Sequence, residues 1–337
     1  MQALIVRRLL LMVPLLVGMT LIAFVISHSV PADPVAANLG QQAAENPAIV
    51  ATFRQQWGLD KPLPEQYLAY LANLFRGNMG MSIRTHMPVA QDLGRYLPAS
   101  GELAITATLV GIVIGIPFGV VSAVRRNQWI DHLVRGVSLL GVSSPVFWLG
   151  LVALYIFYFR LGWLPGPGRL DVGMAEPHHI TGMYTFDSLL TGNWPALYSS
   201  VRHLLLPGLV LASVYVGLVT RMTRSSMLEV LNADYVRTAR GKGLRERSVI
   251  YKHALGNALI PTVTVLGLAF GDILAGTVLT ETIFAWPGIG RYAFQSAVTL
   301  DFPAIMGVSL AIAFIFITVN LATDIMYFVL DPRLRRA

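Results

Sequence analysis

Residues 103–124 read LAITATLVGIVIGIPFGVVSAV, an apolar stretch that contains no charged side chain. An α-helix rises about 1.5 Å per residue, so about 20 residues cross the hydrocarbon core of a bilayer, which is about 30 Å thick. Membrane-spanning strands instead give short segments of alternating polarity. The stretch therefore predicts a helical membrane protein.

The composition of the whole chain agrees with this prediction. The chain has 337 residues, of which 55% are hydrophobic and 13% are charged, and its mean hydropathy is +0.61. Soluble domains average about 45–50% apolar and about 25% charged residues. The composition excludes a soluble enzyme, a disordered protein and a basic-faced nucleic-acid binder. Because there is no cysteine, disulfide scaffolds, thiolate metal sites and cysteine nucleophiles are also excluded.

Several apolar stretches are long enough to cross a membrane, and they predict an all-α polytopic protein with six transmembrane helices. The fourth is the shortest, and we expect it to continue past Arg221 as a helix. The six run over Leu9–Ile26, Leu103–Val124, Leu133–Phe159, Leu204–Thr220, Ala258–Ile283 and Phe302–Leu330.

The basic residues predict the orientation of these spans. The formal net charge is +7, and Lys and Arg gather at the N-terminus and in segments 125–135, 221–252 and 333–336. Cytoplasmic loops of membrane proteins carry such an excess. We therefore place both termini in the cytoplasm and expect no nucleic-acid partner. The first apolar run exceeds the 7–15 residues of a usual signal-peptide core, so we expect an uncleaved span.

These spans divide the chain into an N-terminal transmembrane helix (1–30), an external subdomain (31–100) and a core (101–337). In the subdomain, a turn-rich break at Trp57–Pro64 precedes a predicted amphipathic helix over Glu65–Phe75. The second external loop contains His178 and His179, and two neighbouring histidines without a third ligand are weak support for a metal. We expect no metal site.

The third external loop and the fifth span contain candidate pathway or gate residues. Trp286, Pro287 and Gly288 place an aromatic side chain beside a Pro-Gly turn, which fits either a gate or docking lip or a tryptophan anchor at the membrane interface. Asp272 and Glu281 lie within or near the fifth span. A carboxylate at the bilayer centre costs at least about 2.5 kcal/mol, so it should face protein or water.

Small residues recur at helical spacing in two spans. They are Gly111, Gly115 and Gly119 in the second span, and Gly267 and Gly271 in the fifth. Glycines four residues apart let two helix backbones approach closely. Two interpretations stay open, namely packing within one chain and packing against a partner subunit.

The segment 221–257 is long, basic and patterned. Ser226-x-x-Glu229 reads as a capping box, and Met227, Leu231, Tyr235 and Ala239 then form one predicted helical stripe. Gly241 and Gly243 should end this helix, with a second helix starting near Arg245. Such a helix–turn–helix could lie on anionic lipid or dock into a groove of a cytoplasmic partner. The paired glycines favour docking.

Residues 234–244 (DYVRTARGKGL) and 253–261 (HALGNALIP) resemble the cytoplasmic signature loop of binding-protein-dependent ABC importer permeases. The resemblance is closest to the first permease subunit of the dipeptide/oligopeptide/nickel class, and segments 58–62, 221–229, 280–290 and 331–333 fit the same class. The chain keeps Ala239 and Gly243 of the general family pattern. It departs at Arg237, Thr238, His253 and Gly256, which favours the peptide class over sugar or amino-acid permeases.

The resemblance implies a type I ABC importer permease in a bacterial inner membrane, with segment 31–100 as a periplasmic subdomain. It implies that the helix over 234–243 is a coupling helix seated in an ATP-binding subunit. The implied partners are a second homologous permease, two ATP-binding subunits, a periplasmic solute-binding protein and membrane lipid. The implied coupling residues are Asp234, Tyr235, Arg237, Ala239, Arg240, Gly243, His253 and Asn257.

No catalytic motif is present, and Gly241-Lys242-Gly243 lacks the rest of a phosphate-binding loop. We therefore expect a non-catalytic chain without a cofactor, whose partner subunits carry ATP and Mg. The resemblance makes peptides the expected cargo, and nickel complexes, opines and oligosaccharides remain alternatives. A self-contained intramembrane enzyme or channel would need converging catalytic groups or rings of charge. The sequence shows neither.

Overall fold

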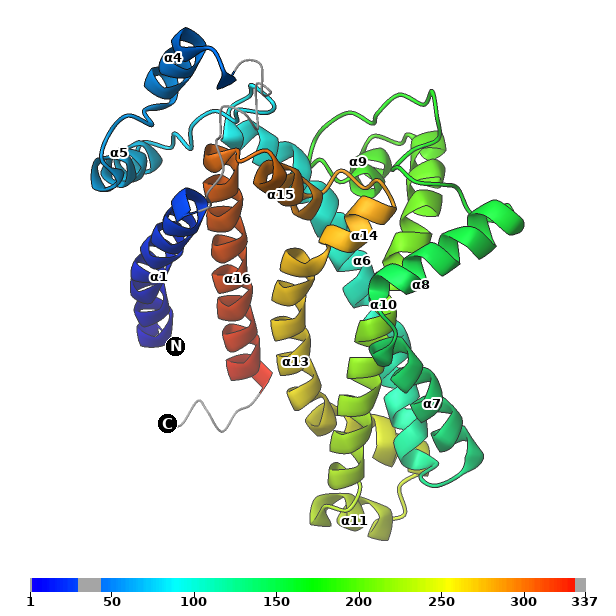
Figure 1. Cartoon of the computed structure of the whole chain (residues 1–337). Coiled ribbons are helices and arrows are strands. Elements are labelled where there is room, and N and C mark those ends of the chain that lie inside the picture. The colour runs from blue at the N-terminus through cyan, green and yellow to red at the C-terminus, as the bar shows by residue number, and fades with distance from the viewer. Residues whose placement is uncertain (1, 30–43, 331–337) are drawn as a thin grey trace. The chain divides into compact units, whose positions relative to one another are not determined.

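A computed structural model of the chain describes residues 2–29 and 44–330, and within these ranges some side chains, among them that of Asp272, are not described. The regular elements in these ranges are helices (Figure 1), apart from one isolated antiparallel bridge between Met81 and Pro88. The predicted all-α class is confirmed. The predicted motif at 331–333 lies outside the described residues.

The chain forms two compact units, one comprising Met1–Ala99 with Pro287–Ile317 and the other Ser100–Trp286 with Thr318–Ala337. The predicted separation of segment 31–100 as an external subdomain stays a prediction. Two long helices, α6 (Val89–Val124) and α16 (Phe302–Leu330), each contribute residues to both units.

The remaining helices of the first unit are α1 (Gln2–Ser29), α4 (Pro47–Trp57), α5 (Leu63–Phe75) and α15 (Ile289–Val298). The Asn46 side chain accepts a hydrogen bond from the Ala48 N–H and so caps the start of α4. Gly58 ends α4 at a φ of +67°, a conformation that glycine adopts without strain. The predicted break and the amphipathic helix that follows it are therefore confirmed.

The second unit contains most of the helices. They are α7 (Trp129–Ser143), α8 (Val146–Ala153), the π-helical η1 (Leu154–Arg160), α9 (Tyr184–Leu190), α10 (Trp194–Val230), α11 (Asp234–Gly241), α12 (Glu246–Ser248), the π-helical η2 (Val249–Ala254), α13 (Leu255–Gly276) and α14 (Val278–Ile283).

Among the described residues, four helical segments are long and apolar enough to cross a membrane, and a bent pair could form a fifth span. The expected count of six is not confirmed, because the apolar part of α1, Leu10–Ile26, is shorter than a full span. The four segments are Val89–Val124, Trp194–Val230, Glu246–Gly271 and Phe302–Met326.

The prediction of one continuous third span over Leu133–Phe159 is wrong. The pair Trp129–Ser143 and Val146–Arg160 bends by 102°. Ser144 takes an extended conformation, with ψ of 132°, and Pro145 follows it. Proline disfavours the helical conformation of the residue before it, so the helix breaks at this step.

The expected extension of the fourth span past Arg221 is confirmed, because α10 continues to Val230. Its neighbour is α6, on which the three small residues Gly111, Gly115 and Gly119 face Tyr215, Val219 and Thr223 of α10. A Cβ atom built on Gly115 would lie 2.7 Å from the Val219 Cβ. Of the two interpretations of this glycine stripe, packing within the chain is the one that the structure shows.

Candidate functional site

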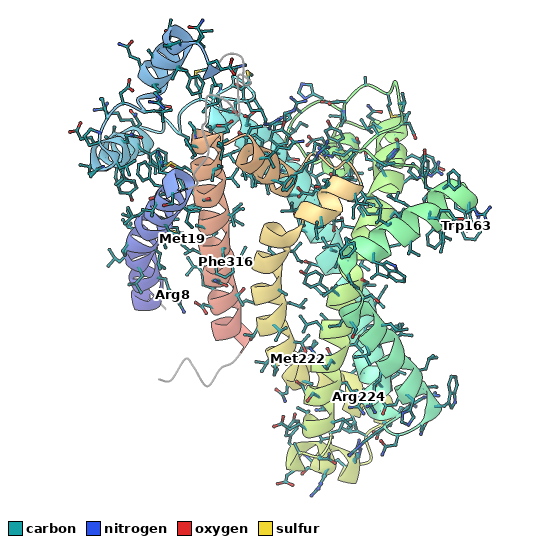
Figure 2. The ribbon with its side chains drawn as sticks, viewed as in Figure 1. Arg8, Met19, Trp163, Met222, Arg224 and Phe316 are labelled. Carbon is teal, nitrogen blue, oxygen red and sulfur yellow. The ribbon has the colours of Figure 1, made fainter. Side chains whose placement is uncertain are left out.

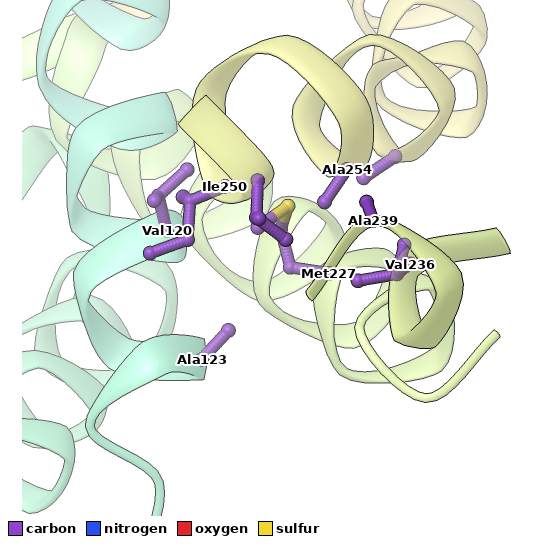
Figure 3. Packing of buried hydrophobic residues seen from close by; sticks show 9 residues of the cluster. Val120, Ala123, Met227, Val236, Ala239, Ile250 and Ala254 are labelled. Carbon is purple, nitrogen blue, oxygen red and sulfur yellow. The ribbon is translucent and has the colours of Figure 1, made fainter. Parts of the chain in front are cut away.

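The candidate site lies in the second unit, where α10, α11 and η2 meet. Figure 3 shows that buried apolar side chains from five elements fill the junction. The members of this cluster, which we call the junction cluster, are Val120 and Ala123 of α6, Met227 of α10, Val236 and Ala239 of α11, Val249, Ile250 and Ala254 of η2, and Ala258 of α13.

The path of the chain into α11 differs from the predicted one. Ser226 and Glu229 lie inside α10, so the predicted capping box is wrong. A capping box needs free N–H groups at a helix start, whereas α10 reaches Ser226 as a continuous helix. The helix instead ends at Val230, and α11 begins after the extended residue Ala233. The predicted single stripe from Met227 to Ala239 therefore spans two helices.

Helix α11 has one face in the junction cluster and one face in solvent. Val236 is fully buried and Ala239 is 7% exposed. Asp234, Arg237 and Thr238 are exposed, and we call these three residues the outer face of α11. An amphipathic helix of eight residues would be marginal alone, so the buried face stabilises it.

The sequence placed Tyr235 and Ala239 on one contact face, and the structure separates their roles. Ala239 packs inside its own chain. Tyr235 is 44% exposed, and its hydroxyl accepts a hydrogen bond from the Asn257 side-chain amide at 2.8 Å. This bond ties α11 to the start of α13.

The turn after α11 is held by Arg240. Its guanidinium forms a salt bridge with Glu246 at 2.8 Å and also donates a hydrogen bond to the Leu231 carbonyl oxygen. The hydrogen bond to Glu246 raises the pKa of Arg240. Gly243 takes a φ of +75°, as expected for a residue that reverses the chain. Arg240 therefore connects the end of α10, α11 and α12.

His253 completes the predicted set and is half-buried on η2, between the cluster members Ile250 and Ala254. All eight predicted coupling residues thus lie on the segment from α11 to the start of α13. The buried residue Val236 was not predicted as an anchor of α11. Its spacing of three residues from Ala239 is the helical signal that could have identified both residues as the buried face.

The candidate pathway residues occupy a different environment. Glu281 is fully buried, and it accepts hydrogen bonds from the Ser100 hydroxyl at 2.5 Å and the Thr277 hydroxyl at 2.7 Å. Asp272 lies on α13, and its side chain falls outside the described residues. Glu281 is therefore paired with hydroxyl groups, as its burial requires.

Trp286 is 1% exposed, and the guanidinium of Arg169 lies 5.3 Å from the centre of its ring. A membrane-interface anchor needs an indole at the surface, so the anchor interpretation does not fit this structure. Pro287 and Gly288 come directly before α15, and Gly288 is the N-terminal cap residue of that helix. The gate interpretation stays a prediction.

The described ranges 2–29 and 44–330 contain no group of three or more His, Cys, Asp or Glu residues arranged to hold a metal ion. His178 and His179 are both exposed.

Comparisons with known proteins cover nearly the whole chain. Residues 115–336 match the family described as "Binding-protein-dependent transport system inner membrane component", and residues 1–95 match the corresponding N-terminal family. The probable D,D-dipeptide transport system permease protein DdpB of Escherichia coli is 49% identical, over 95% of this chain and 93% of its own.

Two further relatives carry similar names. The dipeptide transport system permease protein DppB of Alkalihalophilus pseudofirmus is 45% identical, over 98% of each chain. The di/tripeptide transport system permease protein DppB of Pseudomonas aeruginosa is 43% identical, over 99% of each chain.

Proposed function

Since the chain belongs to the family of binding-protein-dependent transport system inner membrane components, we propose that it is the permease subunit of an ATP-driven importer of dipeptides and oligopeptides. The family match extends over most of the chain, and the relatives named above are peptide permeases of nearly equal length. Nickel complexes, opines and oligosaccharides stay alternative cargoes, and no observation favours them.

The observation that carries the proposal is the two-sided helix α11. Its outer face is exposed, with Asp234 and Arg237 paired to each other, and its inner face is fixed to the chain through Val236 and Ala239. A force on the outer face would reach α10 through Met227 and α13 through Ala258, because side chains in a close-packed cluster cannot move independently. The helix is therefore suited to couple an external motor to the membrane spans.

The proposed coupling residues then take two kinds of role. Asp234 and Arg237, on the outer face, would contact an ATP-binding subunit directly. The others would position α11: Ala239 by packing in the cluster, Arg240 and Gly243 by holding the turn, Tyr235 and Asn257 by their shared hydrogen bond, and His253 by its place on η2.

The complete importer would contain two ATP-binding subunits at α11, a second homologous permease, and a periplasmic solute-binding protein. Both termini of this chain would lie in the cytoplasm of a bacterial inner membrane, in accord with the Lys and Arg bias of the sequence. This chain would perform no catalysis and hold no cofactor, because ATP and Mg would bind the ATP-binding subunits. Glu281 and the residues around Trp286 would belong to the pathway or its gate.

The proposal is tested by reversing a charge on the outer face of α11. We expect Arg237→Glu to abolish copurification of the ATP-binding subunits and peptide uptake by the reconstituted importer, without lowering the melting temperature of the purified subunit. The reason is that the Arg237 side chain is 69% exposed and its ion pair with Asp234, at 3.6 Å, is also exposed, so losing it costs little stability. The charge-matched control is Arg54→Glu on exposed α4, which should bind and transport normally.

A second variant tests the buried face of α11. Ala239→Glu places a charge in the junction cluster, so we expect uptake to be lost while the protein still inserts into the membrane. Normal uptake by either Arg237→Glu or Ala239→Glu would contradict the coupling assignment.

A further inference from the structure

A basic cavity of about 500 Å³ lies between α7 and α10, outside the junction cluster. This volume is within the range of roughly 300–1,000 Å³ that is usual for ligand sites. Its wall carries four basic side chains, His132 and Arg135 from α7 and Arg221 and Arg224 from α10. Figure 2 places Arg224 toward the end of α10 that leads into α11.

The two helices that form the cavity run antiparallel and are closely packed. Asp131 of α7 binds Arg224 of α10, and further along the pair Gly217 of α10 faces Ser138 of α7. A Cβ atom on Gly217 would lie 2.5 Å from the Ser138 carbonyl oxygen. The walls are therefore fixed by backbone contact, and the cavity is a built feature of the fold.

Only part of the basic charge is neutralised. Arg224 donates two hydrogen bonds to the Asp131 carboxylate, at 2.8 and 2.9 Å. The same carboxylate also accepts hydrogen bonds from the Ser122 hydroxyl and the Asn127 N–H. Arg135 and Arg221 are exposed, and neither forms a salt bridge with another residue in the described part of the chain. Two guanidinium groups thus remain available to an anion.

Ser138 supplies a second, independent sign of a ligand. This residue lines the cavity and is 8% exposed, yet its buried hydroxyl has no hydrogen-bond partner. Buried hydroxyl groups are nearly always bonded, so an unbonded one calls for an absent partner. Because this oxygen has almost no accessible surface, the Ser138 side chain must rotate toward the cavity before it can donate to an acceptor atom of a ligand.

Polarity changes along the cavity, chiefly on the α7 side. On α7, His132 and Arg135 are followed by the exposed apolar residues Leu139 and Val142. On the antiparallel α10, Arg221 and Arg224 lie at the same end as Arg135. A molecule bound here would meet cations at one end and hydrocarbon at the other.

We propose that this cavity binds an anionic phospholipid, with the phosphate between Arg135 and Arg221, an oxygen accepting from Ser138, and an acyl chain along Leu139 and Val142. Basic pockets between membrane helices on the cytoplasmic side bind acidic headgroups, and the cytoplasmic leaflet is rich in them. That the basic end of the cavity faces the cytoplasm rests on the membrane orientation given with the function proposed above. A free anion would not use the apolar end of the cavity, and binding of a peptide there is an outcome of the test below.

The test is native mass spectrometry of the purified subunit with phosphatidylglycerol, with phosphatidylcholine and with inorganic phosphate. We expect retention of phosphatidylglycerol over phosphatidylcholine, and no competition by millimolar phosphate. The double variant Arg135→Gln/Arg221→Gln should weaken binding by about tenfold or more, a free-energy change of about 1.4 kcal/mol.

Two controls distinguish lipid binding in the cavity from general electrostatic attraction of anionic lipid to the protein. Arg245→Gln/Arg247→Gln removes the same charge from exposed residues on the same predicted side, and it should leave retention unchanged. Ser138→Ala removes no charge, and it should weaken phosphatidylglycerol binding without lowering the melting temperature measured in phosphatidylcholine.

Equal retention of both lipids, equal losses in the two double variants, or phosphate binding without lipid retention would each overturn the proposal. So would displacement of the bound lipid by a peptide cargo. None of these outcomes affects the coupling assignment, which is read from copurification of the ATP-binding subunits.

Discussion

Two arginine–carboxylate pairs in the second unit have similar contact distances and very different surroundings. Arg169 contacts Glu102 at 2.6 Å, and the two side chains are 5% and 4% exposed. Arg224 contacts Asp131 at 2.8 Å, but the arginine side chain is 21% exposed while the carboxylate is fully buried. The first pair is closed on both sides, and the second opens into the basic cavity.

The closed pair fastens a long loop. Arg169 lies over the Tyr184 ring at 3.5 Å and donates to the Gly182 carbonyl, while Glu102 on α6 accepts from the Thr185 N–H and hydroxyl. These contacts join segment 161–193 to itself and to α6, and Arg169 also lies against Trp286. The open pair has solvent on the arginine side. A pair buried on both sides therefore closes the structure around it, whereas a pair with a partly exposed arginine leaves a charge near a place where a ligand can enter.

The largest effect is expected from removing the carboxylate of the closed pair. We expect Glu102→Ala to destabilise the protein by about 3–5 kcal/mol, because Arg169 would stay buried without a counter-charge. The melting temperature in detergent and protease cleavage within residues 161–193 measure the effect.

The double variant Glu102→Gln/Arg169→Met is the control for the closed pair. It removes both charges together and should recover part of the lost stability. A single variant as stable as the wild type would show that the pair does not hold the loop.

The corresponding change in the open pair should be milder. We expect Asp131→Asn to cost about 2 kcal/mol, because Asn keeps some hydrogen bonds and Arg224 can turn toward solvent in the cavity. Melting temperatures of Asp131→Asn and Glu102→Gln, measured under the same conditions, compare the two pairs directly. A larger loss for Asp131→Asn would reverse the comparison.

The smallest expected effect depends on pH and concerns Asp187, which lies in the loop that the closed pair fastens. Its burial would raise the pKa of Asp187, but hydrogen bonds from the Thr181 hydroxyl and from the Ile180, Thr181 and Gly182 N–H groups outweigh it and hold the pKa below its ordinary value. Because the pKa of Asp187 is lower in the folded than in the unfolded chain, where it is about 4, its ionisation stabilises the fold at pH values above about 4. This stabilisation is lost as the pH falls through the pKa of the folded state.

We therefore expect Asp187→Asn to cost about 1 kcal/mol at pH 6–8 and less as the pH falls below about 4. The measurement is the difference in melting temperature between variant and wild type across this pH series. Thr191→Val, which removes the hydroxyl of a neighbouring residue with no bond to the carboxylate, should give a pH-independent difference. A constant difference for Asp187→Asn would contradict the assignment.

The sequence predicted much of this molecule because its main signals are local. The apolar run at 103–124, the glycines at 58 and 243 and the pattern of the α11 segment each act within a few turns of chain. The third span was mispredicted because hydropathy sums over a stretch and does not register the backbone preference that Pro145 imposes on Ser144. The capping box was mispredicted because a cap signature means nothing inside a helix that has already started.

Local sequence patterns predicted the helical class, four of the membrane spans and the position of the patterned segment after α10. Long-range packing sets the inward orientation of Ala239, the hydrogen bond between Tyr235 and Asn257, and the burial that distinguishes the two arginine pairs. The physical reason is that helical periodicity specifies which residues share a face, whereas the neighbour that covers this face comes from distant parts of the chain. Burial of a charge or a hydroxyl depends on that neighbour, so it cannot be read from local sequence.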